Sequence, residues 1–142
     1  MIIDTSAVLT LIEGSRAAHD LADHLTAGDD IHIPATTAAE CLIILTHRHG
    51  PLGRTLYERT RQEFAITTVD FTQAHAITTL RAFLEYRAIG LSYTDLMAYA
   101  VAQVAHESLL TTDPAFSKTA LEFTGFLGAW PAPPTDASTS AH

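Results

Sequence analysis

The chain has 142 residues, of which 47% are hydrophobic and 17% are charged. This composition is that of an ordinary folded domain, and it excludes a disordered chain and a pair of domains with separate full cores. Sixteen acidic residues face eight basic ones, so the net charge of −8 argues by itself against a protein that binds polyanions. The single cysteine, Cys41, excludes an internal disulfide and is expected in the core.

Short apolar segments alternate with longer amphipathic ones from the start of the chain. Residues 1–4 are predicted to form a buried strand, followed by helices over 6–12 and 17–27. A strand over 31–33 is expected to end at Pro34, because proline has no N–H to donate to a sheet. This order of segments favours an α/β protein.

The same alternation continues through the rest of the chain. Thr36 or Thr37 is expected to cap a helix that runs to His49, and Asp70 to cap a later one. Further helices are predicted over residues 52–63, 72–86 (the one capped by Asp70) and 94–105. Further strands are predicted over 65–69 and 108–112, with a possible last one over 122–125. Strands that alternate with helices predict a parallel sheet covered on both faces.

The end of the chain differs from the rest. Residues 131–142 begin with Pro131 and lack apolar periodicity, so a single domain is predicted over 1–130 and a disordered tail over 131–142. No basic leader precedes the first strand, and the apolar residues 7–12 are too few for a secretory core or a membrane span. We therefore expect a cytoplasmic protein.

Four acidic residues stand where the predicted elements meet one edge of the sheet. Asp4 ends the first strand and Asp113 follows the strand over 108–112, while Glu40 and Asp95 lie in the first turns of two helices. In a right-handed crossover fold the carboxyl ends of the strands and the amino ends of the helices share this edge, where ligands gather. The pattern predicts that the four carboxylates meet.

Each of these acids also has a purely structural interpretation. Asp4 could only cap a helix, and Asp95 could only interact favourably with a helix dipole. Glu40 could complete a capping box with Thr37, and Asp113 before a proline could only form a turn. Four carboxylates at one point, however, cannot all ionise without a cation. Hard divalent ions such as Mg²⁺ or Mn²⁺ prefer oxygen ligands, so a metal site is the economical interpretation.

Other polar residues are candidates for supporting roles. The hydroxyl groups of Ser6 and Thr112 stand beside the acids and could orient them or contact a phosphate, or could simply cap and pair strand ends. Four arginines on two consecutive predicted helices could face phosphates or solvent, namely Arg48, Arg54, Arg59 and Arg61. The eight histidines lack the spacing of a zinc site.

Several motifs together resemble those of the PIN-domain ribonucleases, and among them the VapC toxins of bacterial toxin–antitoxin pairs. They are Met1-Ile2-Ile3-Asp4-Thr5-Ser6-Ala7, the helix carrying Glu40, Tyr93-Thr94-Asp95-Leu96-Met97-Ala98-Tyr99-Ala100, and Leu109-Leu110-Thr111-Thr112-Asp113. The resemblance covers the chain up to Trp130. It implies a three-layer α/β/α sandwich and a dimer. It also implies Mg²⁺-dependent endonuclease cleavage of RNA by Asp4, Glu40, Asp95 and Asp113, inhibited by a VapB antitoxin.

Three other functions remain to be weighed. A structure-specific DNA nuclease would use a similar acidic cluster, although long extra elements that clamp duplex DNA are missing. A phosphatase of the haloacid dehalogenase type needs a second acid two residues after the first, where this chain has Ser6. A catalytically silent PIN-like interaction domain would have no need of all four acids. Metal titration followed by incubation with RNA and with DNA separates these functions.

Overall fold

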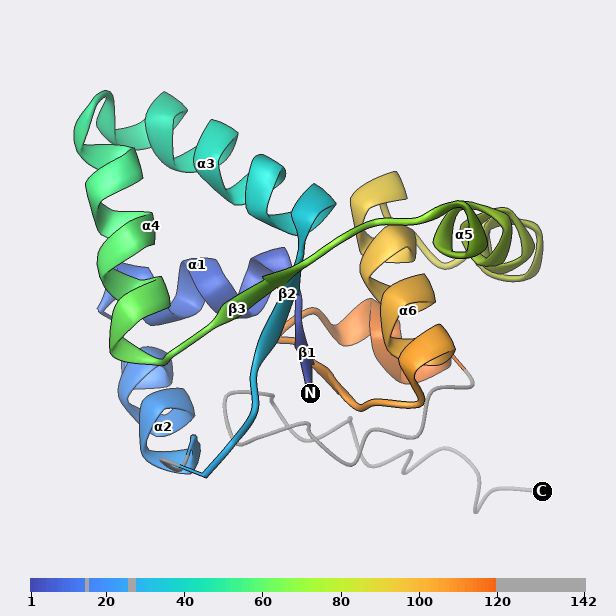
Figure 1. The fold of residues 1–142 in the computed structure, drawn as a ribbon, viewed down its shortest axis with the longest axis horizontal. Coiled ribbons are helices and arrows are strands. Elements are labelled where there is room, and N and C mark those ends of the chain that lie inside the picture. The colour runs from blue at the N-terminus through green and yellow to red at the C-terminus, as the bar shows by residue number, and fades with distance from the viewer. Residues whose placement is uncertain (15, 26–27, 120–142) are drawn as a thin grey trace, which may run out of the picture.

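The computed structural model describes residues 1–14, 16–25 and 28–119. It has four parallel strands in the order β3-β2-β1-β4, with helices on both sides (Figure 1). The strands are β1 (Ile2–Ile3), β2 (His32–Pro34), β3 (Thr67–Val69) and β4 (Leu109–Leu110). The sequence prediction of an α/β fold with a parallel sheet between two helical layers is therefore confirmed.

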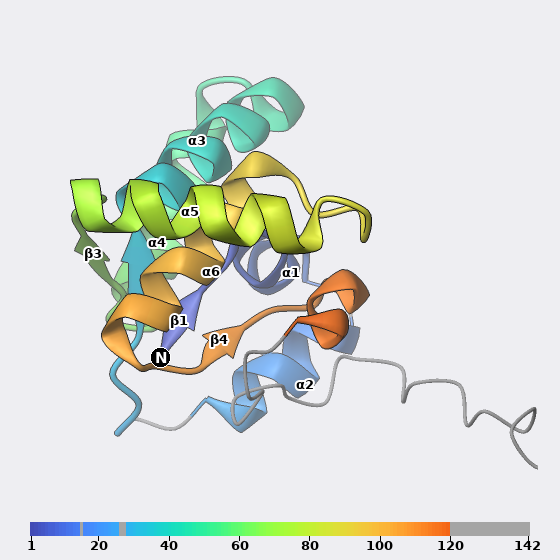
Figure 2. The same cartoon turned by 90° about the vertical axis from the view of Figure 1, so that its right-hand side faces the viewer.

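The helices divide between the two faces of the sheet. One layer contains α1 (Thr5–Glu13), α2 (Arg16–His24), α3 (Ala35–His49) and α4 (Leu52–Glu63), and the other contains α5 (Gln73–Tyr86) and α6 (Tyr93–Ala105) (Figures 1 and 2). A short 3₁₀ helix, η1 (Pro114–Lys118), follows β4 and was not predicted from the sequence. No helix in the described part of the chain is both long and apolar enough to span a membrane.

Two hydrophobic cores lie on opposite faces of the sheet because successive side chains of a strand point to opposite sides. Ile3 and Leu110 belong to the core under α1–α4, whereas Ile2 and Leu109 belong to the core under α5 and α6. All four side chains are at most 1% exposed. A strand of two residues thus joins both layers, which explains why β1 and β4 can be so short.

Two predicted helix starts are wrong. α3 begins at Ala35, directly after Pro34, and no side chain caps it, so neither Thr36 nor Thr37 is its cap. The extended backbone of Pro34 ends β2 and begins α3 without an intervening loop. The cap of α5 is Thr72 rather than Asp70, and the backbone N–H of Thr72 donates to Nδ1 of His75 at 2.9 Å.

The pairing of β1 with β4 brings together the segments that carry Asp4 and Asp113. Ile2 pairs with Leu109 and Ile3 with Leu110, and the backbone N–H of Asp4 donates to the carbonyl of Leu110 at 3.0 Å. Residues 1–4 and 109–113 therefore run side by side although about a hundred positions separate them. The predicted end of α2 at residue 27, the possible strand over 122–125 and the tail over 131–142 lie outside the described residues.

Candidate metal centre

The carboxyl edge of the sheet is where β1 gives way to α1 and β4 to η1. The amino-terminal ends of α3 and α6 lie at this same edge, and these two helices contact each other (Figure 1). Asp4 follows β1, Asp113 follows β4 by three residues, and Asp95 and Glu40 belong to the early turns of α6 and α3. The edge therefore carries side chains from four separate elements.

Asp4 is a buried carboxylate held by three hydrogen bonds. It is 1% exposed and is the N-cap of α1, where it accepts from the backbone N–H of Ala7 at 3.1 Å. It also accepts from the hydroxyl groups of Ser6 at 2.8 Å and Thr111 at 2.7 Å. Among the described residues no cationic side chain pairs with it. Burial raises the pKa of Asp4 to about 7, although its hydrogen bonds favour the charged form.

Asp95 completes the capping box of α6, whose N-cap residue is Ser92, and lies within the field of other acids. Its Oδ2 accepts from the backbone N–H of Ser92 at 2.8 Å, and its own N–H donates to the Ser92 hydroxyl at 3.1 Å, which is a capping box. Burial raises the pKa of Asp95, and the charges of Asp113 and Glu40 raise it further. Asp95 thus has a structural role at the start of α6, and its carboxylate also lies within the field of two other acids.

The four carboxylates form one electrostatic cluster. The charge of Asp95 contributes to the raised pKa of Asp4, and Asp113 and Glu40 contribute to that of Asp95. Asp113 itself accepts from the backbone N–H of Ala115 at 2.9 Å and so caps η1. Glu40 stands on α3, where its capping box with Thr37 is absent because that helix begins earlier. Mutual repulsion is what a cation in their midst would relieve.

The side chains do not form a closed set of metal ligands. In the described ranges no group of three or more His, Cys, Asp or Glu residues is placed so that it could hold an ion. Mg²⁺, however, is commonly held by one or two carboxylates, with water and substrate phosphate completing its shell. Hard oxygen donors and a buried Asp4 carboxylate without a cationic partner in the described residues fit an ion of this kind. They fit a hydrated site that closes on substrate better than a preformed cage.

Hydroxyl groups connect the two strand ends next to the acids. The Ser6 hydroxyl accepts from the backbone N–H of Thr112 at 2.9 Å and lies 3.1 Å from the Thr111 hydroxyl. The Thr112 hydroxyl lies 3.2 Å from that of Thr10. It is therefore Thr111 that donates to Asp4, and the sequence interpretation overlooked it. Side chains alternate along an extended chain, so Thr111 shares a side with Asp113, and this signal could have identified it.

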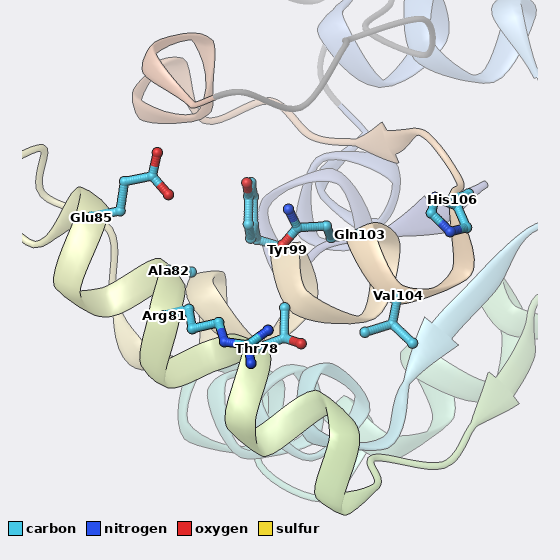
Figure 3. A pocket seen from close by; sticks show the side chains of 8 residues that line it. All are labelled: Thr78, Arg81, Ala82, Glu85, Tyr99, Gln103, Val104 and His106. Atoms are coloured by element: carbon cyan, nitrogen blue, oxygen red, sulfur yellow. The ribbon is translucent and has the colours of Figure 1, made fainter.

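The cavity that Figure 3 shows is separate from these acids. A cavity of about 340 Å³ lies between α5 and α6, with Thr78, Arg81 and Glu85 on one side and Tyr99 and Gln103 on the other (Figure 3). None of the four clustered acids lines it. The candidate site is therefore defined by the charges at the sheet edge and not by this cavity.

The four arginines on α3 and α4 do not act as one patch. Arg48 forms an ion pair with Glu13 of α1, and Arg61 pairs with Glu58 at 3.0 Å. Arg54 and Arg59 are exposed and line a hollow on the outer face of α4. Only these two of the four present a charge that no described ion pair neutralises.

α3 is buried along one face and exposed along another. Cys41 and Leu45 are fully buried, but Ile43 is 70% exposed, so one face of the helix meets solvent. Burial raises the pKa of the Cys41 thiol to about 12, which keeps it protonated and inert. The expectation of a core cysteine is confirmed.

The geometry describes an α/β protein with an acidic site at the carboxyl edge of a parallel sheet, and comparison with known proteins specifies its family. The PIN domain family model matches residues 1–122. Ribonuclease VapC36 of Mycobacterium tuberculosis is 46% identical over 138 residues, which covers 92% of this chain and 98% of the relative. Ribonuclease VapC42 of the same species is 28% identical, over 84% of this chain and 95% of the relative.

Solved structures show the same fold at low sequence identity. VapC20 of Mycobacterium tuberculosis, described as a toxin that cleaves the sarcin–ricin loop, has a TM-score of 0.72 at 14% identity, covering 85% of this chain and 95% of that one. VapBC2 of Rickettsia felis, solved on a promoter DNA fragment, has a TM-score of 0.66 at 16% identity, covering 82% and 89%. The chain belongs to the PIN-domain family, and its relatives are VapC ribonucleases.

Proposed function

We propose that the chain is a metal-dependent endoribonuclease, the toxin of a type II toxin–antitoxin pair in the cytoplasm. The observation that carries this proposal is the buried Asp4 carboxylate, which has no cationic partner in the described residues and is coupled electrostatically to Asp95. The carboxyl of Asp95 in turn lies within the field of Asp113 and Glu40. A chain 46% identical to a ribonuclease supports RNA as the polymer that is cut. Asp4, Asp95, Asp113 and Glu40 would hold Mg²⁺ directly or through its bound water, with Mn²⁺ as a substitute.

The chemistry divides between the ion and the chain. A divalent ion at this site supplies an activated water and shields the phosphate charge. Asp4 is rigid because it stands at the junction of β1 and α1 and accepts three hydrogen bonds, so its oxygens are preorganised. Asp95 and Asp113 are fixed by backbone bonds at helix starts and would share the ion. Glu40 would orient the attacking water, since it is only partly buried.

The net charge of −8 is compatible with an RNA substrate under this proposal. A divalent ion cancels part of the acidic cluster and presents positive charge to one phosphate. Arg54 and Arg59, which no described ion pair neutralises, are exposed on α4 and available to other phosphates. Because the chain has only eight Lys and Arg residues, we expect contact with a short stretch of RNA, and affinity that falls only moderately with salt.

Metal titration with two polymers tests the proposal. The purified chain, stripped with EDTA, should cut RNA only after Mg²⁺ or Mn²⁺ is added, and Ca²⁺ should not replace them, since Ca²⁺ takes more ligands in looser geometry. Single- and double-stranded DNA are incubated in parallel and should remain whole. Cutting of DNA instead would support the nuclease alternative, and no cutting of either polymer at any metal concentration would support the silent interaction domain.

We propose further that the chain forms a homodimer and a complex with a VapB-type antitoxin. A stripe of exposed apolar residues on α5 supports an interface between copies: Ile77 is 44%, Leu80 54% and Leu84 58% exposed, at helical spacing. Light scattering of the purified chain should give twice the monomer mass, and a larger mass with the antitoxin. A monomer at micromolar concentration would contradict the homodimer, and an unchanged mass would contradict the complex.

A further inference from the structure

The two oxygens of the Asp4 carboxylate have different surroundings. Oδ1 accepts from the Ser6 hydroxyl at 2.8 Å and from the backbone N–H of Ala7 at 3.1 Å. Oδ2 accepts from the Thr111 hydroxyl at 2.7 Å. An ionised carboxylate has about two acceptor sites on each oxygen. Both sites of Oδ1 are therefore filled by described groups, whereas Oδ2 keeps one.

Thr111 is itself held firmly in place. It is 1% exposed, its Oγ1 accepts from the backbone N–H of Asp113 at 3.0 Å, and it lies 3.1 Å from the Ser6 hydroxyl. One oxygen atom thus connects Asp4 on the β1–α1 junction to the chain that carries Asp113. The direction of the Thr111 hydroxyl is set by the backbone of one acid and aimed at the side chain of another.

We propose that Thr111 is a positioning residue that makes Asp4 a one-oxygen metal ligand. Its hydroxyl occupies one acceptor site of Oδ2 and leaves the other to a divalent ion, while Ser6 and Ala7 close Oδ1. The inference rests on the proposed function, in which Asp4 binds such an ion. It adds which atom binds and which neighbour fixes the direction of that atom.

The two hydroxyl groups on Asp4 then have unequal effects. Loss of the Thr111 hydroxyl frees the ligating oxygen to turn, so the ion loses a preorganised donor. Loss of the Ser6 hydroxyl removes one of the two hydrogen bonds to Oδ1 and leaves the hydrogen bond from Thr111 to Oδ2 in place. The hydroxyl of Thr10 provides a matched control. It donates to the carbonyl of Ser6 at 2.8 Å and lies 3.2 Å from the Thr112 hydroxyl, so it also connects the segments that follow β1 and β4. It has no described bond to an acid.

Mn²⁺ binding without RNA measures this difference directly. Free Mn²⁺ is followed by electron paramagnetic resonance in titrations of the wild type and of Thr111→Val, Thr111→Ser, Ser6→Ala and Thr10→Val. We expect Thr111→Val to weaken binding by about 10- to 100-fold, as loss of an outer hydrogen bond to a ligand does. Thr111→Ser keeps the hydroxyl and should restore most of the affinity. Ser6→Ala should weaken binding by about five-fold or less, and Thr10→Val should leave it unchanged.

Folding is checked separately by thermal melts in EDTA, and Thr111→Ala replaces Thr111→Val in the comparison if the valine variant does not fold. If the wild type and the folded Thr111 variant that lacks the hydroxyl bind Mn²⁺ with equal affinity, the positioning role of Thr111 is overturned and the proposed function is not. A loss in Thr111→Ser as large as in Thr111→Val, or a larger loss in Ser6→Ala, would overturn the assignment of Oδ2. If the wild type itself binds no Mn²⁺, the proposed function falls together with this inference.

Discussion

Asp4→Asn is expected to abolish metal-dependent RNA cleavage while the fold remains intact. The amide has the shape of the carboxylate, and its oxygen can still accept from Ser6 and Ala7, so α1 keeps its cap. The negative charge that would hold the ion is gone. We expect the cleavage rate to fall by more than about 100-fold, beyond the 10- to 100-fold typical of residues that only support a ligand. Initial rates on a labelled RNA at saturating Mg²⁺ measure the loss.

The same substitution at Asp20 provides the matched control. Asp20 is an exposed residue of α2, and Asp20→Asn removes one negative charge without touching the sheet edge. Its cleavage rate should equal that of the wild type. Circular dichroism of both variants verifies the fold. Retained cleavage in a folded Asp4→Asn protein would remove the proposed mechanism.

The stability of the metal-free chain is expected to fall as the pH rises toward 7, because of Asp4. Burial raises the pKa of this carboxyl from 3.8 to about 7 in the folded chain. Between these two values the folded state keeps a proton that the unfolded state has lost, so the free energy of unfolding decreases with rising pH and levels off above 7. From pH 5 to pH 8 the loss due to Asp4 amounts to roughly 3 kcal/mol.

Comparison of variants isolates this effect from other titrating groups. The free energy of unfolding is measured with urea in EDTA at pH 5 and at pH 8. Relative to the wild type, that of Asp4→Asn should be higher at pH 8 than at pH 5 by roughly 3 kcal/mol. The same unfolding experiments on Asp20→Asn, which removes an exposed carboxylate of α2, control for the loss of one negative charge. Mn²⁺ at pH 8 should stabilise the wild type and leave Asp4→Asn unaffected. A pH-independent difference between Asp4→Asn and the wild type would contradict the burial argument.

The spacing of apolar residues and the positions of glycine and proline were enough to predict most helices and strands. The helix over residues 52–63 agrees with α4 to the residue, since Gly50 and Pro51 stop the preceding helix. The other helices agree within a few residues of their ends. Strands were predicted too long at both ends of the chain. An apolar run shows that a segment is buried, but only pairing with a neighbour decides how much of it becomes strand.

The misplaced helix starts have a local cause. Asp70 and Thr72 are both good capping residues, and the choice between them depends on where the chain leaves β3 and turns onto the sheet. Neither Thr36 nor Thr37 caps α3, because β2 runs directly into the helix at Pro34. The hydroxyl oxygens of Thr36 and Thr37 are instead buried without a partner among the described residues. Residue type alone does not reveal such a junction.

The sequence by itself determined the class of the fold and predicted which four acids stand at one edge of the sheet, because strand ends and helix starts share one edge in any right-handed α/β crossover. Only the tertiary structure decided what surrounds each acid. It buried Asp4, placed Asp95 in a capping box and set Thr111 rather than Thr112 against the carboxylate. The physical reason is that desolvation and hydrogen-bond direction depend on atoms brought together across about a hundred residues, which no local pattern encodes.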